Sequence, residues 1–312
     1  MLSLNDLAKE YHALEKVDKS GFQRKARLLQ SIWREEQGYP IGEHKYKGDS
    51  RPIGSRLAMP WAEEILANYL TDSIRAVVRN EVLDKNKSRG KLYVKPRIFN
   101  DLLSSQPLCF NLFGELQQDL PLATKVFNDL SPTEIKEVTA IEFEYSPGRG
   151  DDRYTGDRSA FDVYVSYLTE SGGRGFLGVE VKYHENLKGK ASPHRERYDQ
   201  VAEIMGCFKI HHLSKLREQP LQQIWRDHLL AGIHKHVDDF DEGAFVFLYP
   251  RENLHCAEAV QTYQEKLSNT DSFLTWTLED VAETIQLHSE QEWINLFIDR
   301  YLDFSKIITA QG

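Results

Sequence analysis

Cysteine is scarce in this sequence, and its few cysteines are scattered. Cys109, Cys207 and Cys256 lie far apart, are odd in number and form no CxxC pair. This argues against a disulfide framework and a cysteine-based zinc site, and it predicts reduced thiols in a cytosolic protein. Cys207 lies near His211 and His212, but this spacing matches no standard zinc pattern, so we interpret Cys207 as a buried thiol beside surface histidines.

Long apolar runs are also missing. The longest, residues 176–181 and 245–248, are far shorter than the roughly 20 residues of a membrane-spanning helix. The N-terminal residues are charged throughout, unlike a signal peptide. We therefore expect a cytoplasmic protein with no membrane association. With 312 residues and 40% hydrophobic content, the chain can bury enough for one large domain, or for a core with an N-terminal extension.

A surplus of positive charge is absent, since the formal net charge is −9. The charge is unevenly distributed, however. Residues 85–97 carry six basic side chains and no acid, whereas residues 277–306 carry seven acids against Arg300 and Lys306. The basic stretch suits a nucleic-acid partner, but a solvated surface without a partner explains it equally well.

Helical spacing of apolar residues dominates the first part of the chain. Leu4 to Leu14 and Phe22 to Trp33 predict two helices or one broken helix. Residues 38–57 are polar and rich in glycine and proline, which predicts a loop or linker, and Pro60 opens a further helix. The domains expected are a helical extension over residues 1–50 and a main domain over residues 51–312.

The period changes to that of strands from about residue 137. Apolar residues that alternate with polar ones predict a strand that ends at Tyr145. Two further strands are predicted over residues 160–167 and 175–183, and a glycine-rich turn joins them as a hairpin. Helices follow over about 195–207 and 220–235, then a strand at residues 244–250, then helices around 256–268 and 278–304. The order predicts an α/β fold with a three-stranded meander, helices, a further strand and helical additions at both ends.

Charged residues stand inside two of these strands. Glu180 and Lys182 are two residues apart, so they share a strand face, while Asp162 stands between Phe161 and Val163. A carboxylate in such apolar surroundings needs a charged partner or a metal. A hairpin centred near Ser171 would set Asp162 across from Glu180 at roughly 5 Å between β-carbons, although a slip of one residue would separate them.

Two converging carboxylates form an oxygen-ligand site that suits Mg²⁺, whose other ligands are water and substrate phosphate. A neighbouring lysine can orient or deprotonate the attacking water and offset charge on the phosphate. The chemistry expected is hydrolysis of a phosphodiester. An ordinary ion cluster between strands is the alternative interpretation.

The ExK pattern alone is weak evidence, because Glu134 to Lys136 and Glu43 to Lys45 also have it. The first of these follows Ser131-Pro132-Thr133, which predicts a helix N-terminus, and the second lies in the polar loop. Only Glu180-Val181-Lys182 lies in a buried-strand pattern after a strand that carries an aspartate.

The segments GDRSAFDVYV and RGFLGVEVKYHE resemble the PD-(D/E)XK nuclease superfamily. The resemblance is greatest to a bacterial restriction-endonuclease-like branch, and it extends through LLSSQPLCFNLFGEL, EFEYSPGRGDDRYTGDRSAFD, QQIWRDHLLA and GAFVFLYPRENLHC, over roughly residues 55–280. The superfamily's proline before the aspartate is absent, since Ala160 and Phe161 precede Asp162.

This resemblance implies a site and a cofactor. Asp162, Glu180 and the Val181 carbonyl would be ligands of Mg²⁺, with Mn²⁺ as a substitute, and Lys182 would be the catalytic lysine. Glu144 is an auxiliary candidate, or else a surface residue of its strand. Glu115 and Gln223 resemble auxiliary positions of such nucleases, but helix-surface roles explain both better.

The resemblance also implies DNA as the substrate and, by analogy alone, defence against foreign DNA. The flanking loops could grip a phosphate backbone or could be plain solvated loops, and their candidate contacts are Arg149, Arg153, Arg158, Lys188, Lys190 and Arg195. Two rivals stay open: a nuclease-fold DNA-binding or regulatory subunit that cuts only with a partner, and an interaction protein whose helix bearing Trp293 and Phe297 forms an oligomer interface. A homodimer or a partner protein is compatible with each.

Overall fold

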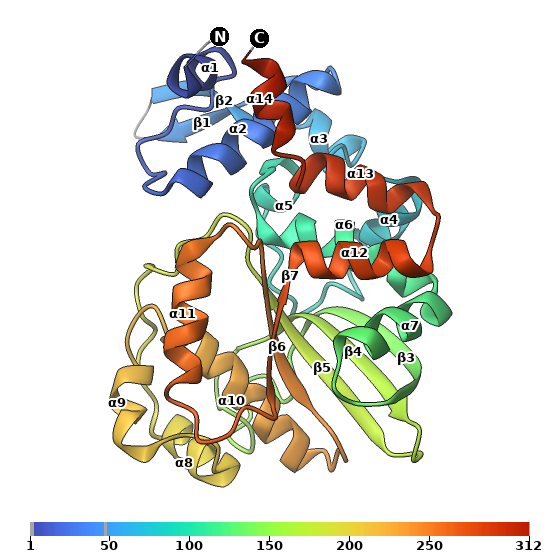
Figure 1. The fold of residues 1–312 in the computed structure, drawn as a ribbon, viewed down its shortest axis with the longest axis vertical. Helices are drawn as coiled ribbons and strands as arrows, with labels where there is room; N and C mark the ends of the chain where they lie inside the picture. The colour runs from blue at the N-terminus through green and yellow to red at the C-terminus, as the bar shows by residue number, and fades with distance from the viewer. Residues whose placement is uncertain (1–2, 47–48, 312) are drawn as a thin grey trace. The chain divides into compact units, whose positions relative to one another are not determined.

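The computed structural model describes residues 3–46 and 49–311. By its internal contacts the chain divides into two compact units. Unit 1 comprises residues 1–115 and 290–312, and unit 2 comprises residues 116–289. Helix α6, Ser105–Gln118, begins in unit 1 and ends in unit 2 (Figure 1).

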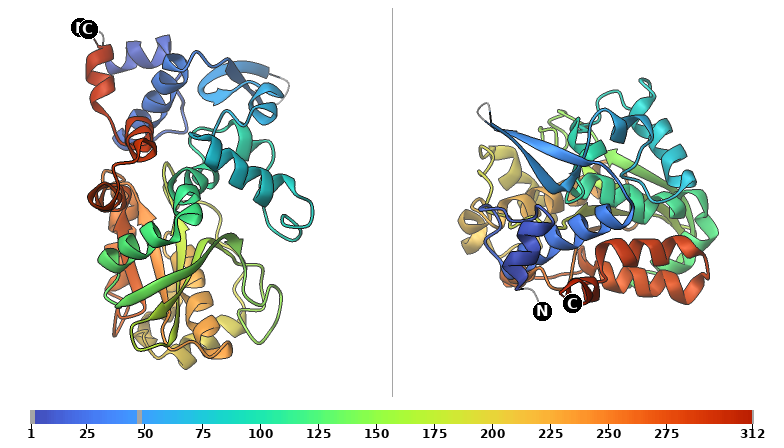
Figure 2. Two further views of the ribbon diagram at one scale, coloured as in Figure 1. Left: turned by 90° about the vertical axis from the view of Figure 1, so that its right-hand side faces the viewer. Right: turned by 90° about the horizontal axis from the view of Figure 1, so that it is seen from above.

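Unit 1 combines short helices with one hairpin. Its other elements are α1 (Leu4–Glu10), α2 (Gly21–Glu36), β1 (Ile41–Tyr46), β2 (Asp49–Leu57), α3 (Trp61–Glu64), α4 (Asp72–Val78), a π-helical turn (Arg79–Leu83), α5 (Arg97–Asn100), α13 (Glu292–Tyr301) and α14 (Ser305–Ala310). Ser20 caps α2 through a capping box with Gln23, so the helix starts where the sequence supplies these partners. The C-terminal helix α14 packs on α2 within this unit (Figure 2).

A buried arginine ties the C-terminal helices into unit 1. Arg300 of α13 is fully buried, and its guanidinium lies 4.1 Å from the ring centroid of Trp33. It donates to the side chain of Gln30 at 3.1 Å and to the Asn68 carbonyl at 2.8 Å. Helix α13 is therefore an integral part of this unit's core.

Two expectations for this part of the chain were wrong. The segment 38–57, expected to be a loop, contains the antiparallel hairpin of β1 and β2. Its polar residues misled the prediction because a two-stranded ribbon need not alternate cleanly in hydropathy. The helix expected from Pro60 onwards is only the single turn α3, and Leu66 beyond it has a positive φ of 54° that no helix continues.

Unit 2 carries a sheet between two helical layers. Its elements are α7 (Leu120–Leu130), β3 (Ile135–Tyr145), β4 (Phe161–Thr169), β5 (Arg174–Val181), α8 (Glu196–Met205), a 3₁₀ turn (Ile210–His212), α9 (Leu213–Leu216), α10 (Gln222–Val237), β6 (Ala244–Tyr249), α11 (Leu254–Gln264), β7 (Phe273–Thr277) and α12 (Leu278–His288). In the described chain these strands form a five-stranded sheet in sequence order. Strands β3, β4 and β5 are antiparallel neighbours, whereas β6 and β7 each join in parallel.

The predicted α/β fold, with its three-stranded meander, later helices and further strand, is confirmed. The edge strand β7 was missed, because its five residues are followed at once by the strong helical pattern of α12. Ser131 to Glu134 do not start a helix: Ser131 ends α7, and the chain enters β3. The prediction failed because a capping pattern marks a helix start only when apolar residues at helical spacing follow it, and none follow here.

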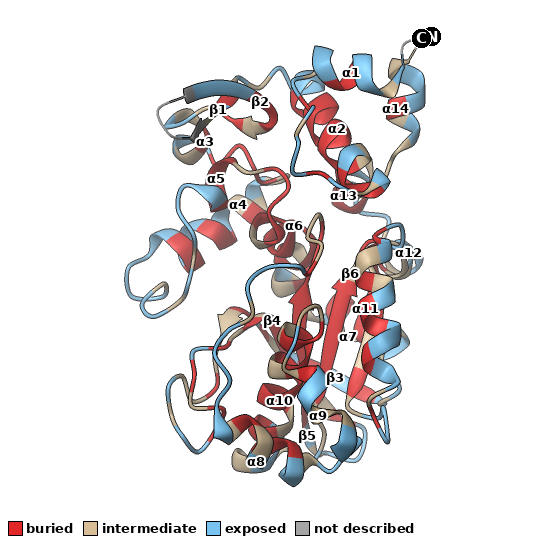
Figure 3. Cartoon of the chain, turned by 90° about the vertical axis from the view of Figure 1, so that its left-hand side faces the viewer, coloured by how far each residue is buried: buried red, intermediate tan, exposed pale blue. Residues whose placement is uncertain are grey.

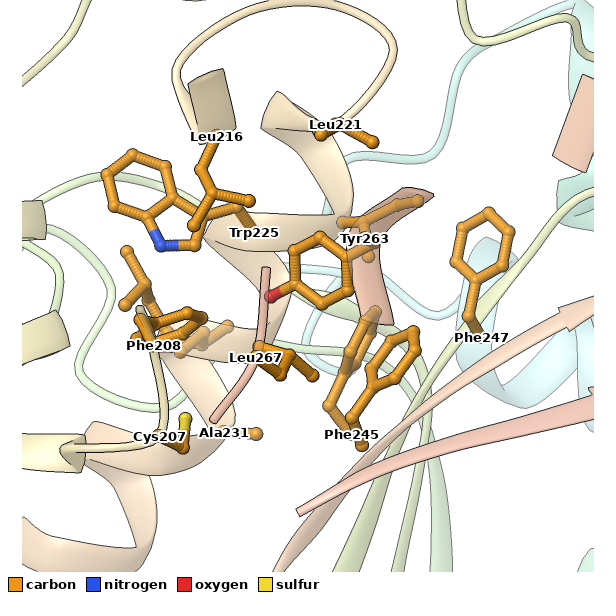
Figure 4. Packing of buried hydrophobic residues seen from close by; sticks show 14 of the residues in the cluster. Cys207, Phe208, Leu216, Leu221, Trp225, Ala231, Phe245, Phe247, Tyr263 and Leu267 are labelled. Atoms are coloured by element: carbon orange, nitrogen blue, oxygen red, sulfur yellow. The ribbon is translucent and has the colours of Figure 1, made fainter. Parts of the chain in front are cut away.

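Helices cover both faces of this sheet. Helices α8, α10 and α11 lie on one face, and α7 and α12 lie on the other (Figure 1). Phe245 and Phe247 of β6 pack with Trp225 of α10 and Tyr263 of α11, as Figure 4 shows. Strands β4, β5 and β6 are almost wholly buried, whereas β3 has exposed positions and the outer side of α11 is exposed (Figure 3). Helix α10 thus packs directly on the sheet, and its inward-facing side chains can contact the strands.

The three cysteines are free thiols and all are buried. Among the residues that the structure describes, no helix is long and apolar enough to cross a membrane.

Candidate active site

Asp162 and Glu180 occupy opposite positions on neighbouring strands. Val163 pairs with Val179, and Tyr164 pairs with Gly178, in the antiparallel ladder of β4 and β5. One step further along the same register, Asp162 faces Glu180. This is the pairing that a hairpin centred on Ser171 requires, as predicted. The two carboxylates therefore lie on the same face, which is the face that α10 covers.

Hydrogen bonds fix the orientation of both carboxylates. The backbone N–H of Val181 donates to Asp162 Oδ2 at 2.8 Å. Glu180 Oε1 accepts from the Lys182 ammonium and, at 2.6 Å, from Gln223 Nε2 of α10. Lys182 itself is held by β6, since its backbone N–H donates to the Leu248 carbonyl at 2.8 Å. The structure thus brings together the two acids and the amine where β5 ends.

Burial makes this cluster electrostatically unusual. Glu180 and Lys182 are only 5% and 6% exposed. The pKa of Asp162 is raised well above its ordinary value by burial and by the nearby charges of Glu180 and Glu144, against the opposing effect of Lys182. Burial alone would lower the pKa of Lys182, but the charges of Glu180, Glu185 and Asp162 outweigh it and raise that pKa. Lys182 is therefore a firmly held ammonium.

Glu144 lies on the far side of Asp162. The β3–β4 pairs Phe143–Val163 and Tyr145–Phe161 leave Glu144 opposite Asp162. Its φ of 50° marks a local irregularity in the strand, and its side chain is half-buried. Glu144 therefore lies at the strand position expected for an auxiliary carboxylate, and its charge helps to raise the pKa of Asp162.

Helix α10 contributes two residues that sequence reasoning undervalued or missed. Gln223 seemed to be a surface residue, yet it bonds Glu180 directly. Asp227, one turn later, is 5% exposed, and its pKa is raised by burial and by Glu180. The only signal for both was their i, i+4 spacing, which places them on one helix face. Glu115, the other soft candidate, belongs to unit 1 and accepts a hydrogen bond from the Thr71 hydroxyl.

Most of the basic residues expected to contact nucleic acid are exposed. Arg153, Arg158, Lys188, Lys190 and Arg195 are exposed, and Arg149 is half-buried. Two of them already have partners in the protein. Arg153 forms a salt bridge with Asp151 at 2.7 Å, and Arg195 donates to the Gly156 carbonyl at 2.8 Å.

The loop before β4 is fastened by Asp157. This buried carboxylate accepts hydrogen bonds from Tyr198 at 2.7 Å, Arg226 at 2.7 Å and the Ser159 N–H at 2.9 Å. Burial would raise its pKa, but these bonds and the Arg226 charge lower it to about 2. The loop is thereby tied to α8 and α10, which positions the start of the strand carrying Asp162.

The donor set fits a hard divalent cation. Asp162 and Glu180 offer carboxylate oxygens, with the Val181 carbonyl beside them. Within the described residues, no group of three or more aspartate, glutamate, histidine or cysteine side chains could hold one ion. Mg²⁺ tolerates such a sparse set, because it commonly binds one or two carboxylates and keeps several waters. An ion that needs a full cage of protein ligands, such as structural zinc, does not fit.

A helix-covered mixed sheet with an aspartate strand, followed by an ExK strand, defines a class of nuclease-type phosphodiesterases. The model of the PD-(D/E)XK nuclease superfamily matches residues 16–303, so the chain belongs to this superfamily. Comparison with curated proteins gave no match. Comparison with solved structures gave none either.

Proposed function

We propose that this protein hydrolyses DNA phosphodiester bonds in a reaction that depends on Mg²⁺, with Mn²⁺ as a substitute. The observation that carries the proposal is the β4–β5 register, which sets Asp162 opposite Glu180 with Lys182 on the same face. The family membership supports the reaction class. Cytoplasmic action and a role in defence against foreign DNA rest on the family resemblance alone.

Each residue has a distinct part in this proposal. Asp162, Glu180 and the Val181 carbonyl would hold the cation, which when bound supplies electrophilic stabilisation of the phosphate oxygens. Gln223 keeps Glu180 in place. Lys182, which contacts Glu180, orients or deprotonates the attacking water and offsets phosphate charge.

The path of the DNA backbone is proposed from the exposed cations. A groove of about 570 Å³ is lined by Lys188, Lys215 and Lys266, together with the acids Glu218 and Glu258. The loop residues Arg149, Arg153, Arg158, Lys190 and Arg195 would add phosphate contacts. Such contacts position the backbone without reading base sequence.

The first prediction concerns cleavage. Asp162→Asn, Glu180→Gln and Lys182→Met should each reduce Mg²⁺-dependent cutting at least about 100-fold, because each removes a charge or ligand at the scissile phosphate. The measurement is cleavage of linear, supercoiled and single-stranded DNA, and of RNA, with and without Mg²⁺.

The chain provides its own matched control for this experiment. Glu134, just before β3, and Lys136, on β3, form the same ExK pattern, but both are exposed. Glu134→Gln and Lys136→Met should cut like the wild type. If the site variants also cut like the wild type, the assignment is wrong. DNA binding without cutting under every metal condition would instead favour a regulatory subunit that needs a partner.

A further inference from the structure

Asp227 is a buried carboxylate whose presence the fold does not explain. It lies on α10 and is 5% exposed, and its Oδ2 atom has no hydrogen-bond partner among the described protein groups. A buried acceptor without a partner costs about 1–3 kcal/mol, and more when it is charged. Nearby Arg226 does not relieve this cost at Oδ2, because its guanidinium donates to Asp157 and to the hydroxyls of Ser159 and Ser192.

The helix face identifies what Asp227 can reach. Gln223 lies one turn earlier on the same face, and its amide contacts Glu180 at 2.6 Å. Glu180 and Lys182 are among the charged groups that act on Asp227. Asp227 therefore lies on the helix face that Gln223 turns toward Glu180, and the charge of Glu180 is the largest that acts on it.

We infer that Asp227 is a further positioning residue of the active site, and that its Oδ2 accepts a hydrogen bond from the water shell of a divalent cation held at Glu180. The inference rests on the proposed function. Among the described residues, no three carboxylate, imidazole or thiol side chains converge on one point, so Asp162, Glu180 and Asp227 do not form a joint ligand set in this structure. A contact through water remains, and Mg²⁺ suits it because this ion retains several bound waters.

Ion binding and stability test this role independently of cutting. Manganese is titrated by calorimetry into the wild type, Asp227→Asn and Asp227→Leu, and unfolding temperatures are measured with and without Mn²⁺. Loss of a residue that orients bound ligands typically weakens metal affinity 10–100-fold, so at least a tenfold weakening is expected. Without the ion, the variants should unfold at the same or a higher temperature than the wild type, because a buried carboxylate oxygen without a partner is gone.

Asp18 provides the matched control. It is also a buried aspartate, but it pairs with Arg27 in unit 1. Asp18→Asn should unfold at a lower temperature and bind Mn²⁺ as the wild type does. A purely structural Asp227 would behave in the same way as Asp18.

The outcomes separate this inference from the proposed function. Unchanged Mn²⁺ affinity in Asp227→Asn, or in Asp227→Leu should the first variant fail to fold, overturns the role of Asp227 while the metal site stands. If the wild type binds no Mn²⁺, or if Asp162→Asn binds it equally well, the proposed function fails and this inference fails with it.

Discussion

Single side chains set the energetics around the site, and Asp157 shows how. Its carboxylate holds the loop before β4 through Tyr198, Ser159 and Arg226. Its pKa is about 2 in the folded protein, below the ordinary value of 3.8. Because the pKa of Asp157 is lower in the folded than in the unfolded protein, its carboxylate stabilises the fold at pH values above the unfolded-state pKa. This stabilisation disappears as the pH falls from about 4 to about 2.

Asp157→Asn should therefore destabilise the protein by about 2 kcal/mol at neutral pH. The difference from the wild type should shrink below pH 4, because protonation then removes the same charge from the wild type. Urea unfolding at pH 3 to 7 measures both quantities. A difference that does not change with pH would show that the Asp157 charge does not fasten the loop.

Individual residues of the site were predictable to different degrees. Asp162, Glu180 and Lys182 could be proposed as candidates because side chains alternate along strands, because a hairpin sets its register, and because the segments around them resemble a nuclease family. Gln223 and Asp227 were not, since the rotation of a helix over a sheet depends on packing that the sequence does not display. Arg153 and Arg195 were expected to contact DNA, and both also bond to groups of the protein itself. Such bonds depend on loop geometry, which the sequence does not display.

At the scale of elements, the close contact of β4 and β5 positions the carboxylates. Gly178 pairs with Tyr164, and a β-carbon added at Gly178 would lie 2.5–2.7 Å from ring carbons of Phe161. Phe161 is fully buried and directly precedes Asp162. The ring can occupy its place only because residue 178 has no side chain.

Gly178→Ala should destabilise unit 2 by about 1–3 kcal/mol through overpacking, and it should reduce cleavage by displacing Asp162. Gly189→Ala is the matched control, since nothing lies within 4 Å of its added β-carbon. Thermal unfolding and cleavage assays of both variants give the comparison. Equal stability of the two variants would show that the start of β4 adjusts without cost.

The strongly periodic elements were the predictable ones. The meander β3–β5, strand β6 and helices α8, α10 and α11 follow from their hydropathy patterns. The hairpin β1–β2 and the edge strand β7 do not, because short or polar strands owe their structure to pairing with a neighbour.

On the scale of the whole molecule, unit 2 contains Asp162, Glu180, Lys182, Gln223 and Asp227. The net charge of −9 does not oppose a DNA substrate, because local cations decide where a phosphate backbone binds. Lys188, Lys215 and Lys266 line one groove of this unit, together with Glu218 and Glu258. The reaction class follows from family membership and the site, whereas the substrate's sequence has no signature in these residues.

The most direct test of the central claim is anomalous diffraction from a crystal soaked in Mn²⁺. We predict a peak between the carboxylates of Asp162 and Glu180, with oxygen ligands at roughly 2.0–2.2 Å, and no such peak in Asp162→Asn. A soaked wild-type crystal with no ion between these two carboxylates, or with ions only elsewhere, would contradict the account.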